Sequence, residues 1–560
     1  MSLFTTVVSK IPRRNRFHQP HEKILSANFG AITPVGIYEL DPGDTFVDRI
    51  EASIKVAPMK APAFGRIDAT FHFFFVPRRL LYDEFEDFIT GGTTGTFLPA
   101  NFSQLNPVAP YFDFTELGQN GKLVNGSLSD YLGMPTVTPS GQVFEGIPPI
   151  DAMPYAGYSK IFSDWYRDEL LDTEEFEPLS TGKILTTNPL FDSLTALRYR
   201  AWKKDYFTSA RPDTQLGPEV GVPVSGDISY NGPLRLFMTG ALNINKDVLI
   251  DGNTAVEEVD VNGVTRKFRN IYPGLDPTSE NVGNSTRLYY GDGLSLDNAE
   301  ILINNLRRSL KVQEWREKNM RGGNRYIENM FHHFGVKSSD ARLQRSQYLG
   351  GRKLPVVIGE VLQSVDTRVT QEGVTTGNPL GQRGGIANAG GVTQKIKFFA
   401  EEHGFVYCLL SILPKAAYYQ GIPRIFADRW DPMSYVWPEF GNLGEQEVYN
   451  WEIYVRAGTG GKNGAVFGYQ SRYADRKFQF NSIHGEFRSG QLMSWHTGRQ
   501  FSAQPQLNKN FIYFPSDDTA GGMNRLFVVE KNSDAAHFYV HIWHNLTLVK
   551  TLPKYGIPSI

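Results

Sequence analysis

One stretch, residues 67–79, constrains the fold more than any other part of the chain. Its sequence is IDATFHFFFVPRR, in which apolar side chains take every second position from Ile67 to Phe75. Successive side chains of a strand point to opposite faces, so this pattern predicts a central strand with one face fully buried and the other buried in part. Pro77 cannot donate a hydrogen bond to a sheet and should end the strand. A helix is expected after it, over about 79–89.

The length and composition extend this β interpretation to the whole chain. The 560 residues are too many for one ordinary core, which leaves several domains or one sandwich with large insertions. Aromatic residues make up 13% of the chain, and 54 glycines and 33 prolines accompany them. That combination favours many short strands joined by tight turns and long loops. We therefore prefer one sandwich with insertions.

The cysteine content and the apolar runs bear on where the protein is made. Cys408 is the single cysteine, it stands in the apolar run FVYCLLSIL, and it is expected to pack as a small buried apolar residue. An intrachain disulfide is impossible, which favours folding in a reducing compartment. No apolar run approaches the ~18 residues of a membrane-spanning helix, so no membrane insertion is expected.

Charge is unevenly distributed although the formal net charge is only −2. Residues 1–23 carry five basic residues against one acidic residue, 218–300 carry six against twelve, and 301–353 carry twelve against four. Such blocks are typical of a chain that presents different surfaces to different environments, or simply of solvated faces. The predicted division is a basic N-terminal arm (1–28), the first sandwich strands with long helical and loop excursions (29–217), an inserted acidic β-hairpin module (218–300), and a basic helical segment followed by the remaining strands and a C-terminal hairpin (301–560).

Several local elements can be predicted inside these divisions. Apolar stripes predict helices over about 156–171 and 191–207. In the acidic module, Asn262-Gly263 stands between two strand-like runs and predicts a hairpin with a two-residue loop.

Further elements are predicted towards the C-terminus. Asp297 with Glu300 resembles a capping box, so a helix should begin there and stop at Gly322. The last two strand-like runs, residues 524–530 and 537–549, are expected to pair as a hairpin.

The candidates for catalysis or metal binding are weak. His537 and His541 share one face of a predicted strand, but four residues of strand place them ~13 Å apart, too far to share one zinc ion. The glycine-rich GTGGKNG around Lys462 departs from the phosphate-binding loop because Asn463 replaces the required Ser or Thr. We therefore expect no catalytic residue, no metal and no cofactor.

Nucleic-acid binding has a local case, because single strands bind to basic grooves that carry aromatic rings. The near-zero net charge disfavours a monomeric single-strand binder. The predicted DNA-contacting residues are Arg13, Arg14, Arg16, Phe17, Arg198, Arg200, Trp202, Lys203 and Lys204. The second group could equally form an exposed helix face or a subunit contact. The aromatic loop residues predicted to anchor subunit interfaces, unless they cover their own sandwich, are Tyr111, Phe112, Phe114, Trp430, Tyr435 and Trp437.

Several motifs spread along the chain are similar to those of one known family. They are FHFFFVPRRLLYDEFEDFITGG at 71–92, HFGV followed by SSDARLQRSQYLGG at 333–351, Trp437–Gly441 (WPEFG), Phe467–Tyr469 (FGY) and Ser471–Phe478 (SRYADRKF). This set resembles the major capsid protein of the Microviridae, the small icosahedral phages with single-stranded DNA, and in particular of the Gokushovirinae.

The resemblance implies a mainly β fold, a single antiparallel eight-stranded jelly-roll sandwich with long inter-strand insertions that contain several helices. It implies a structural protein of the virion, not an enzyme, which assembles in the bacterial host cytoplasm into a T=1 icosahedral shell around a circular single-stranded DNA genome. The implied partners are further copies of the chain, the genome, a small basic internal DNA-binding protein, a scaffolding protein, a DNA pilot protein and a host surface receptor. The module at 218–300 is the expected surface protrusion used in host attachment.

The residues alone leave a second function open. A β-sandwich carbohydrate-binding protein or glycoside hydrolase would also suit the aromatic content and the long loops. A hydrolase would have to bring two carboxylates to within ~5 to 9.5 Å of each other in a cleft.

Overall fold

The computed structural model shows a mainly β chain in two compact units, which are described separately. The first unit comprises residues 1–214 and 319–560, and the second comprises 215–318. The residues that the structure describes are 14–90, 109–137, 143–218, 225–230, 236–239, 258–261, 264–267, 287–290, 294–300, 303–322, 326–335, 337, 339, 344–362, 369–371, 374–376, 383–458, 461–515, 523–528 and 536–555.

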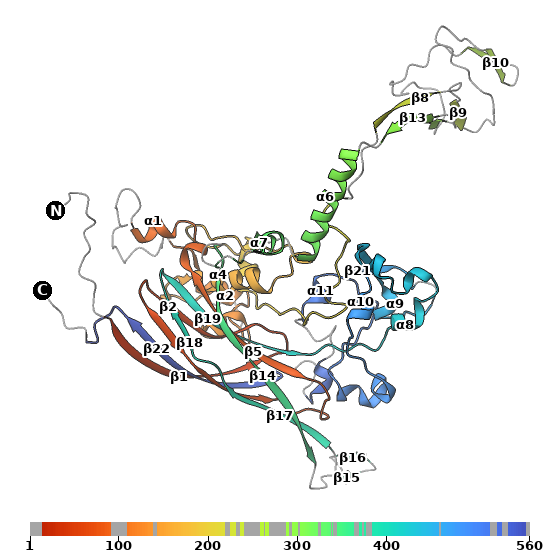
Figure 1. Cartoon of the computed structure of the whole chain (residues 1–560). Coiled ribbons are helices and arrows are strands. Elements are labelled where there is room, and N and C mark those ends of the chain that lie inside the picture. The colour runs from red at the N-terminus through yellow and green to blue at the C-terminus, as the bar shows by residue number, and fades with distance from the viewer. Residues whose placement is uncertain are drawn as a thin grey trace, which may run out of the picture. The chain divides into compact units, whose positions relative to one another are not determined.

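A large antiparallel sheet dominates the described part of the first unit. It has ten strands, in the order β18-β3-β22-β4-β17-β14-β5-β19-β2, with β1 paired to β22 (Figure 1). The strands are β1 (Asn15–Ala27), β2 (Thr33–Leu40), β3 (Thr45–Asp48), β4 (Ile50–Val56), β5 (Ile67–Pro77), β14 (Gln347–Leu362), β17 (Arg383–Val392), β18 (Ile396–Phe399), β19 (Gly404–Pro414) and β22 (Phe538–Lys550).

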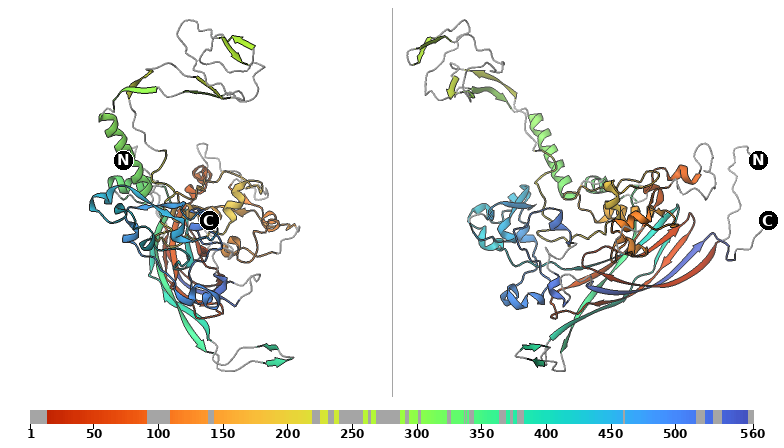
Figure 2. Two further views of the ribbon diagram at one scale, coloured as in Figure 1. Left: turned by 90° about the vertical axis from the view of Figure 1, so that its right-hand side faces the viewer. Right: turned by 180° about the vertical axis from the view of Figure 1, so that it is seen from behind.

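The long strand β14 joins the two halves of this sheet. Its first part pairs with β5 and its last six residues pair with β17, so it belongs to both groups of strands. Its register shifts between Tyr348 and Gly350. At Gly351 a Cβ atom would lie 2.4 Å from the carbonyl oxygen of Phe71, so only glycine allows this close approach of the two backbones. Figure 2 shows β14 running along most of the length of the sheet.

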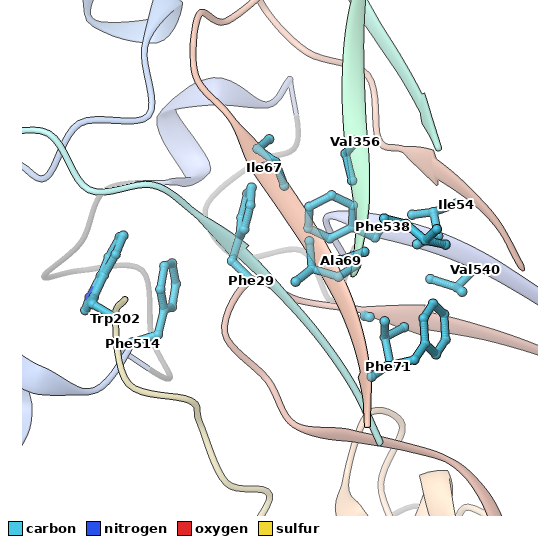
Figure 3. Packing of buried hydrophobic residues seen from close by; sticks show 14 of the residues in the cluster. Phe29, Ile54, Ile67, Ala69, Phe71, Trp202, Val356, Phe514, Phe538 and Val540 are labelled. Atoms are coloured by element: carbon cyan, nitrogen blue, oxygen red, sulfur yellow. The ribbon is translucent and has the colours of Figure 1, made fainter. Parts of the chain in front are cut away.

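The strand predicted at 67–77 is β5, and its predicted burial is confirmed. Ile67, Ala69, Phe71 and the other residues of that face lie in the main core, which also holds Phe538 and Val540 of β22 (Figure 3). The opposite face contributes Phe74 and Val76 to a second core, while Thr70 and His72 stay partly exposed. A strand that is covered on both faces must lie inside the subunit.

The neighbouring strand β19 repeats this arrangement. Val406, Cys408 and Leu410 enter the main core, and Tyr407 enters the second core, where its hydroxyl donates to the carbonyl of Pro154 at 2.8 Å. The prediction that Cys408 packs as a buried apolar residue is confirmed, and burial raises the pKa of its thiol.

Helices and loops cover the second core. The helix α4 packs on β5 and β19 (Figure 1). It begins at Met153, three residues before the predicted start, and a π-helical turn, η3 (Phe162–Tyr166), continues it. The elements of this layer are η1 (Arg78–Leu80), α1 (Phe85–Thr90), β6 (Tyr111–Phe112), α2 (Phe114–Gln119), α3 (Leu128–Leu132), β7 (Ile150–Asp151), α4 (Met153–Ile161) and α5 (Pro189–Thr195).

Two helix predictions differ from the structure in extent. The segment after Pro77 is not one helix but the turn η1 followed by α1. The helix predicted over 191–207 ends at Thr195, because the chain beyond it is extended and bonded to other segments. Arg200 illustrates the cause: its N–H donates to the carbonyl of Gly30 at 2.7 Å, and its carbonyl accepts from the N–H of Phe514 at 3.0 Å.

The remaining elements of the first unit lie outside the large sheet. They are α7 (Tyr326–Phe334), β15 (Val369–Gln371), β16 (Val374–Thr376), α8 (Arg424–Ala427), η4 (Pro432–Ser434), η5 (Pro438–Asn442), β20 (Glu445–Tyr449), α9 (Asn450–Ile453), β21 (Val466–Ser471), α10 (Ala474–Lys477), η6 (Gly485–Arg488), η7 (Gly490–Trp495), α11 (Lys509–Ile512) and η8 (Asn524–Leu526).

The two ends of the chain differ from their predictions. The predicted strand near the C-terminus is β22, but the predicted C-terminal hairpin is wrong, because Asn524–Leu526 is a 3-10 turn and β22 pairs with β1, β4 and β3. The inward side chains of β22 are buried in the main core. The strand therefore lies between other strands of the large sheet and does not form a separate hairpin. Residues 15–27 of the predicted arm form β1, whereas 1–13 lie outside the described residues.

The second unit holds paired strands and most of a long helix. Val261 of β10 pairs with Val264 of β11, which confirms the predicted hairpin with a two-residue loop. The predicted capping box is wrong, because Asp297 and Glu300 pair with β8 as part of β13. The bounds are β8 (Ser225–Tyr230), β9 (Leu236–Thr239), β10 (Glu258–Val261), β11 (Val264–Lys267), β12 (Arg287–Tyr290), β13 (Leu294–Glu300) and α6 (Ile303–Gly322), the last of which ends in the first unit. Among the described residues of both units, no helix is long and apolar enough to cross a membrane.

Candidate subunit interface

One segment of the first unit exposes large apolar side chains instead of burying them. We call residues 422–443 the apolar segment. Trp430 is 89% exposed and Phe426 is 76% exposed, in contrast to the phenylalanines of β5. Its exposed large apolar residues are Ile422, Ile425, Phe426, Trp430, Met433, Tyr435, Val436, Trp437 and Leu443. A concentration of exposed apolar side chains is typical of surfaces that bind other molecules.

Short turns explain why the apolar segment cannot bury these side chains itself. It contains α8, η4 and η5, each of five residues or fewer. Pro432 and Pro438 occupy first positions of η4 and η5, where the fixed φ of proline suits a helical turn. The Asp431 carboxylate caps η4 by accepting from the N–H of Met433 at 2.9 Å. Turns of this length present most of their side chains outwards.

A buried ion pair fixes the first part of the segment. Arg424 donates from Nη1 to Oε1 of Glu452 at 3.3 Å and from Nε to Asp428 at 2.6 Å. The hydroxyl of Tyr206 donates to the other oxygen of Glu452 at 2.9 Å. Burial raises the pKa of Glu452, and the guanidinium of Arg424 opposes that rise. Burial alone would lower the pKa of Arg424, but Glu452 and its other partners outweigh this effect and raise it.

Polar contacts also fix the second part of the segment. Arg429 forms an ion pair with Asp475. Arg472 donates to the carbonyl of Met433 at 3.1 Å, and the N–H of Trp437 donates to the hydroxyl of Tyr473 at 3.3 Å. These bonds place the WPEFG motif beside the SRYADRKF motif. The apolar segment therefore combines a fixed backbone with exposed rings, the arrangement that interfaces use for their anchor residues.

Comparison with known proteins identifies the kind of molecule that carries this surface. The family model described as capsid protein (F protein) matches residues 5–560. The chain belongs to this capsid protein family.

Individual relatives align with nearly the full length of the capsid protein. It is 30% identical to capsid protein VP1 of Chlamydia phage 1, over 100% of this chain and 97% of the relative. It is 30% identical to capsid protein VP1 of Bdellovibrio phage phiMH2K, over 99% and 97%, and 25% identical to capsid protein VP1 of Spiroplasma virus 4, over 98% and 95%. The resemblance to microvirus capsid proteins is confirmed, and the relatives are structural proteins rather than enzymes.

The structure separates the predicted interface residues of the capsid protein into two groups. Trp430, Tyr435 and Trp437 are exposed and belong to the apolar segment. Phe112 and Phe114 are buried in the second core and cover their own subunit, which was the alternative for these residues. Tyr111 is half-buried in β6. The first group remains a predicted interface.

The predicted DNA-contacting residues near the N-terminus lie on or beside β1. Arg14 and Arg16 are exposed and Phe17 is half-buried. The guanidinium of Arg14 lies over the ring of Phe399, 5.3 Å from its centroid. Arg13 lies outside the described residues.

The second predicted DNA-contacting group is mostly engaged inside the subunit. Trp202 is 2% exposed in the main core and offers no free ring face to a base. Arg198 pairs with Glu174, and this hydrogen bond is the main cause that lowers the pKa of the Glu174 carboxyl to about 2. The other members are Arg200, which donates to the Ser411 hydroxyl, Lys204, which pairs with Asp168, and Lys203, which is exposed.

Sequence reasoning missed several members of the apolar segment. Ile425, Phe426 and Met433 are exposed in the same segment as the predicted Trp430 and Trp437. A signal was available, since these residues stand among Pro, Asp and Arg without the alternation of a strand or the period of a helix.

The described residues of the capsid protein were compared with the requirements of metal sites and of glycoside hydrolases. They contain no group of three or more His, Cys, Asp and Glu side chains that could hold a metal ion. A pocket of about 240 Å³ beside Trp202 and Arg499 is lined by Phe501, Gln504, Asn508 and other uncharged residues, without a carboxylate or histidine. It lacks the two carboxylates that a glycoside hydrolase requires.

Proposed function

We propose that this capsid protein self-assembles into a small T=1 icosahedral shell that encloses a circular single-stranded DNA genome. The observation that carries the proposal is the apolar segment, whose exposed rings stand on a backbone held by buried polar contacts. An obligate interface resembles a core cut in half, and an isolated subunit would leave these side chains in water. The proposal is also supported by the alignments with phage capsid proteins, which cover nearly the whole of this chain and of each relative.

An eight-stranded jelly roll at the centre of the ten-stranded sheet forms the wall of this proposed shell. The support is the sharing of β14 between two groups of antiparallel strands and the placement of the main core between strands of both groups. In this proposal the strand β1, whose side chains are mostly exposed, is not one of the eight strands but pairs with β22 as an additional strand.

The acidic module at 218–300 serves in this proposal as a surface protrusion that contacts the host receptor. Its support is that 215–318 forms a compact unit of its own. Particles that lack residues 220–292 should assemble but fail to adsorb to host cells. Normal adsorption of such particles would contradict this role.

The proposed place of the protein is the virion, with assembly in the bacterial host cytoplasm. Its proposed partners are a scaffolding protein during assembly, a small basic internal DNA-binding protein, a DNA pilot protein and the genome. Co-purification of these partners from infected cells with assembly intermediates would test this set.

Electron microscopy of the purified protein in native buffer, with a nuclease-treated aliquot beside it, tests the proposed assembly. The expected result is uniform icosahedral particles that contain nuclease-protected single-stranded DNA. If co-expression with the scaffolding protein of the same phage also yields only monomers or small oligomers, the proposal is contradicted.

A further inference from the structure

A cluster of three aromatic side chains, one exposed and two half-buried, lies outside the apolar segment. Phe64 is 64% exposed although it directly precedes the buried strand β5. Its ring stacks with that of Trp495 at a centroid separation of 6.1 Å and an angle of 30°. The ring of Phe487 meets Phe64 edge to face at 6.1 Å. We call Phe64, Phe487 and Trp495 the aromatic platform.

The backbone beneath the aromatic platform is fixed from several sides. The N–H of Phe64 donates to the carbonyl of Trp495 at 2.5 Å, and its carbonyl accepts from the N–H of Thr497 at 3.3 Å. A Cβ atom at Gly65 would lie 2.2 Å from the side-chain hydroxyl oxygen of Thr497, so only glycine allows this segment to pass so close to Thr497. These backbone contacts therefore hold the ring of Phe64 in its exposed position.

Arg525 and His496 hold the loops that carry the other two rings. Arg525 donates from Nε to the carbonyl of Met493 at 2.9 Å and from Nη2 to the carbonyl of Gly498 at 2.6 Å. Nε2 of His496 lies 2.8 Å from the carbonyl oxygen of Phe487. Burial lowers the pKa of His496, which favours its neutral form.

The residues that adjoin the aromatic platform in the sequence are mainly basic. Lys60 and Arg488 are exposed, and within the described residues neither forms an ion pair with a carboxylate. Arg66 bonds to Asp68, but Lys353 shares that carboxylate at 2.6 Å. The Asp68 carboxylate is buried and is shared by two cations, so it offsets only part of the positive charge of Arg66 and Lys353.

We propose that the aromatic platform binds single-stranded DNA, with a base stacked on Phe64 and the backbone phosphates neutralised by Lys60, Arg66 and Arg488. The proposal rests on the genome enclosure proposed above and names the surface that makes the contact. An exposed ring beside basic side chains is the combination that binds single strands without sequence preference. A purely apolar partner would gain nothing from the positive charge, whereas a single strand uses both features, its bases stacking on the ring and its phosphates meeting the basic side chains.

Binding of a fluorescein-labelled 20-nucleotide oligo(dT) to the unassembled full-length protein, followed by fluorescence anisotropy, tests this proposal. Phe64→Ala should weaken binding roughly 5- to 150-fold, the range expected for loss of one stacked base. Phe64→Trp should retain binding. Phe478→Ala, which truncates an exposed phenylalanine outside the platform, is the matched control and should bind as the unaltered protein does.

Salt dependence and assembly separate DNA binding from a subunit contact. Arg488→Gln should reduce the slope of log affinity against log salt by about 0.7, the contribution of one phosphate contact on a single strand. Unchanged oligonucleotide binding by Phe64→Ala would overturn the proposal, whether or not particles still form. The proposed function has a separate test, which the anisotropy measurement does not replace. It would be contradicted if particles of the unaltered protein protected no DNA.

Discussion

The strand β5 and the apolar segment both contain many aromatic side chains, but β5 buries them and the apolar segment exposes them. β5 places its aromatic residues in a regular alternation, and cores of the same subunit cover both of its faces. The apolar segment places its aromatic residues in short turns, where many of them remain exposed. The aromatic residues of β5 stabilise the subunit, and in the proposed assembly those of the apolar segment contact other subunits. Changes in the two regions should therefore have separable effects on folding and on assembly.

The largest effect on folding is expected from Phe73→Ala in β5. Phe73 is fully buried in the main core, and truncating such a ring costs about 3–5 kcal/mol of unfolding free energy. Urea denaturation of the unassembled subunit would measure the loss, with Phe478→Ala as the control at an exposed phenylalanine. If both variants unfolded at the same urea concentration as the unaltered protein, β5 would not have the role assigned to it.

The next effect concerns the frame beneath the apolar segment. Arg424→Met leaves the carboxylate of Glu452 buried without its cation, which should cost about 3 kcal/mol. Combining it with Glu452→Gln removes the buried charge and should recover most of the loss. The same denaturation assay measures both. A double variant as unstable as Arg424→Met would show that packing, not the unpaired charge, causes the loss.

Acid should destabilise the folded subunit through two histidines, the half-buried His72 and the buried His537. Burial lowers the pKa of His72 and of His537 to about 4, and the charge of Arg200 adds to the shift of His72. Between pH 6.5 and 4 the unfolded chain then binds more protons than the folded chain, so stability is complete above pH 6.5 and falls as the pH drops. Each histidine contributes at most about 3 kcal/mol to this fall. His537→Gln should flatten the pH dependence of the melting temperature, and an unchanged pH profile would exclude His537 as a contributor.

The smallest effect on folding is expected from Trp430→Ala in the apolar segment. Since the side chain is 89% exposed, its truncation should change the free energy of unfolding by less than about 0.5 kcal/mol. Assembly should nevertheless weaken by about 2 kcal/mol or more at each interface that the tryptophan anchors. Sedimentation of the variant would show subunits in place of particles. Normal particles from a variant with a normal melting temperature would remove Trp430 from the interface.

The sequence was sufficient to predict the elements whose own side chains carry a regular pattern. Alternation identified β5, the apolar run around Cys408 identified this residue of β19 as buried, and the Asn-Gly turn identified the hairpin of β10 and β11. The strand β1 was not predicted, because most of its residues are polar and its pairing with β22 holds it extended. The early end of α5 was not predicted either, since backbone bonds to Gly30 and Phe514 determine it.

The candidate interface was predictable only in part. Trp430 and Trp437 were identified as loop aromatics, but the same argument selected Phe112 and Phe114, which are buried. Composition does not show which way a turn presents its side chains, because contacts such as the Arg424 and Glu452 pair decide this. Trp202 shows the same limit, since its basic neighbours suggested a DNA surface and the ring lies in the main core.

Hydrogen exchange measured by mass spectrometry on assembled particles and on unassembled subunits tests the central claim most directly. Peptides that cover residues 422–443 should exchange markedly more slowly in particles, because another copy of the chain covers them. Peptides from β5 and β19 should be equally protected in both states, since each subunit buries these strands by itself. Equal exchange of residues 422–443 in particles and in subunits would contradict the account.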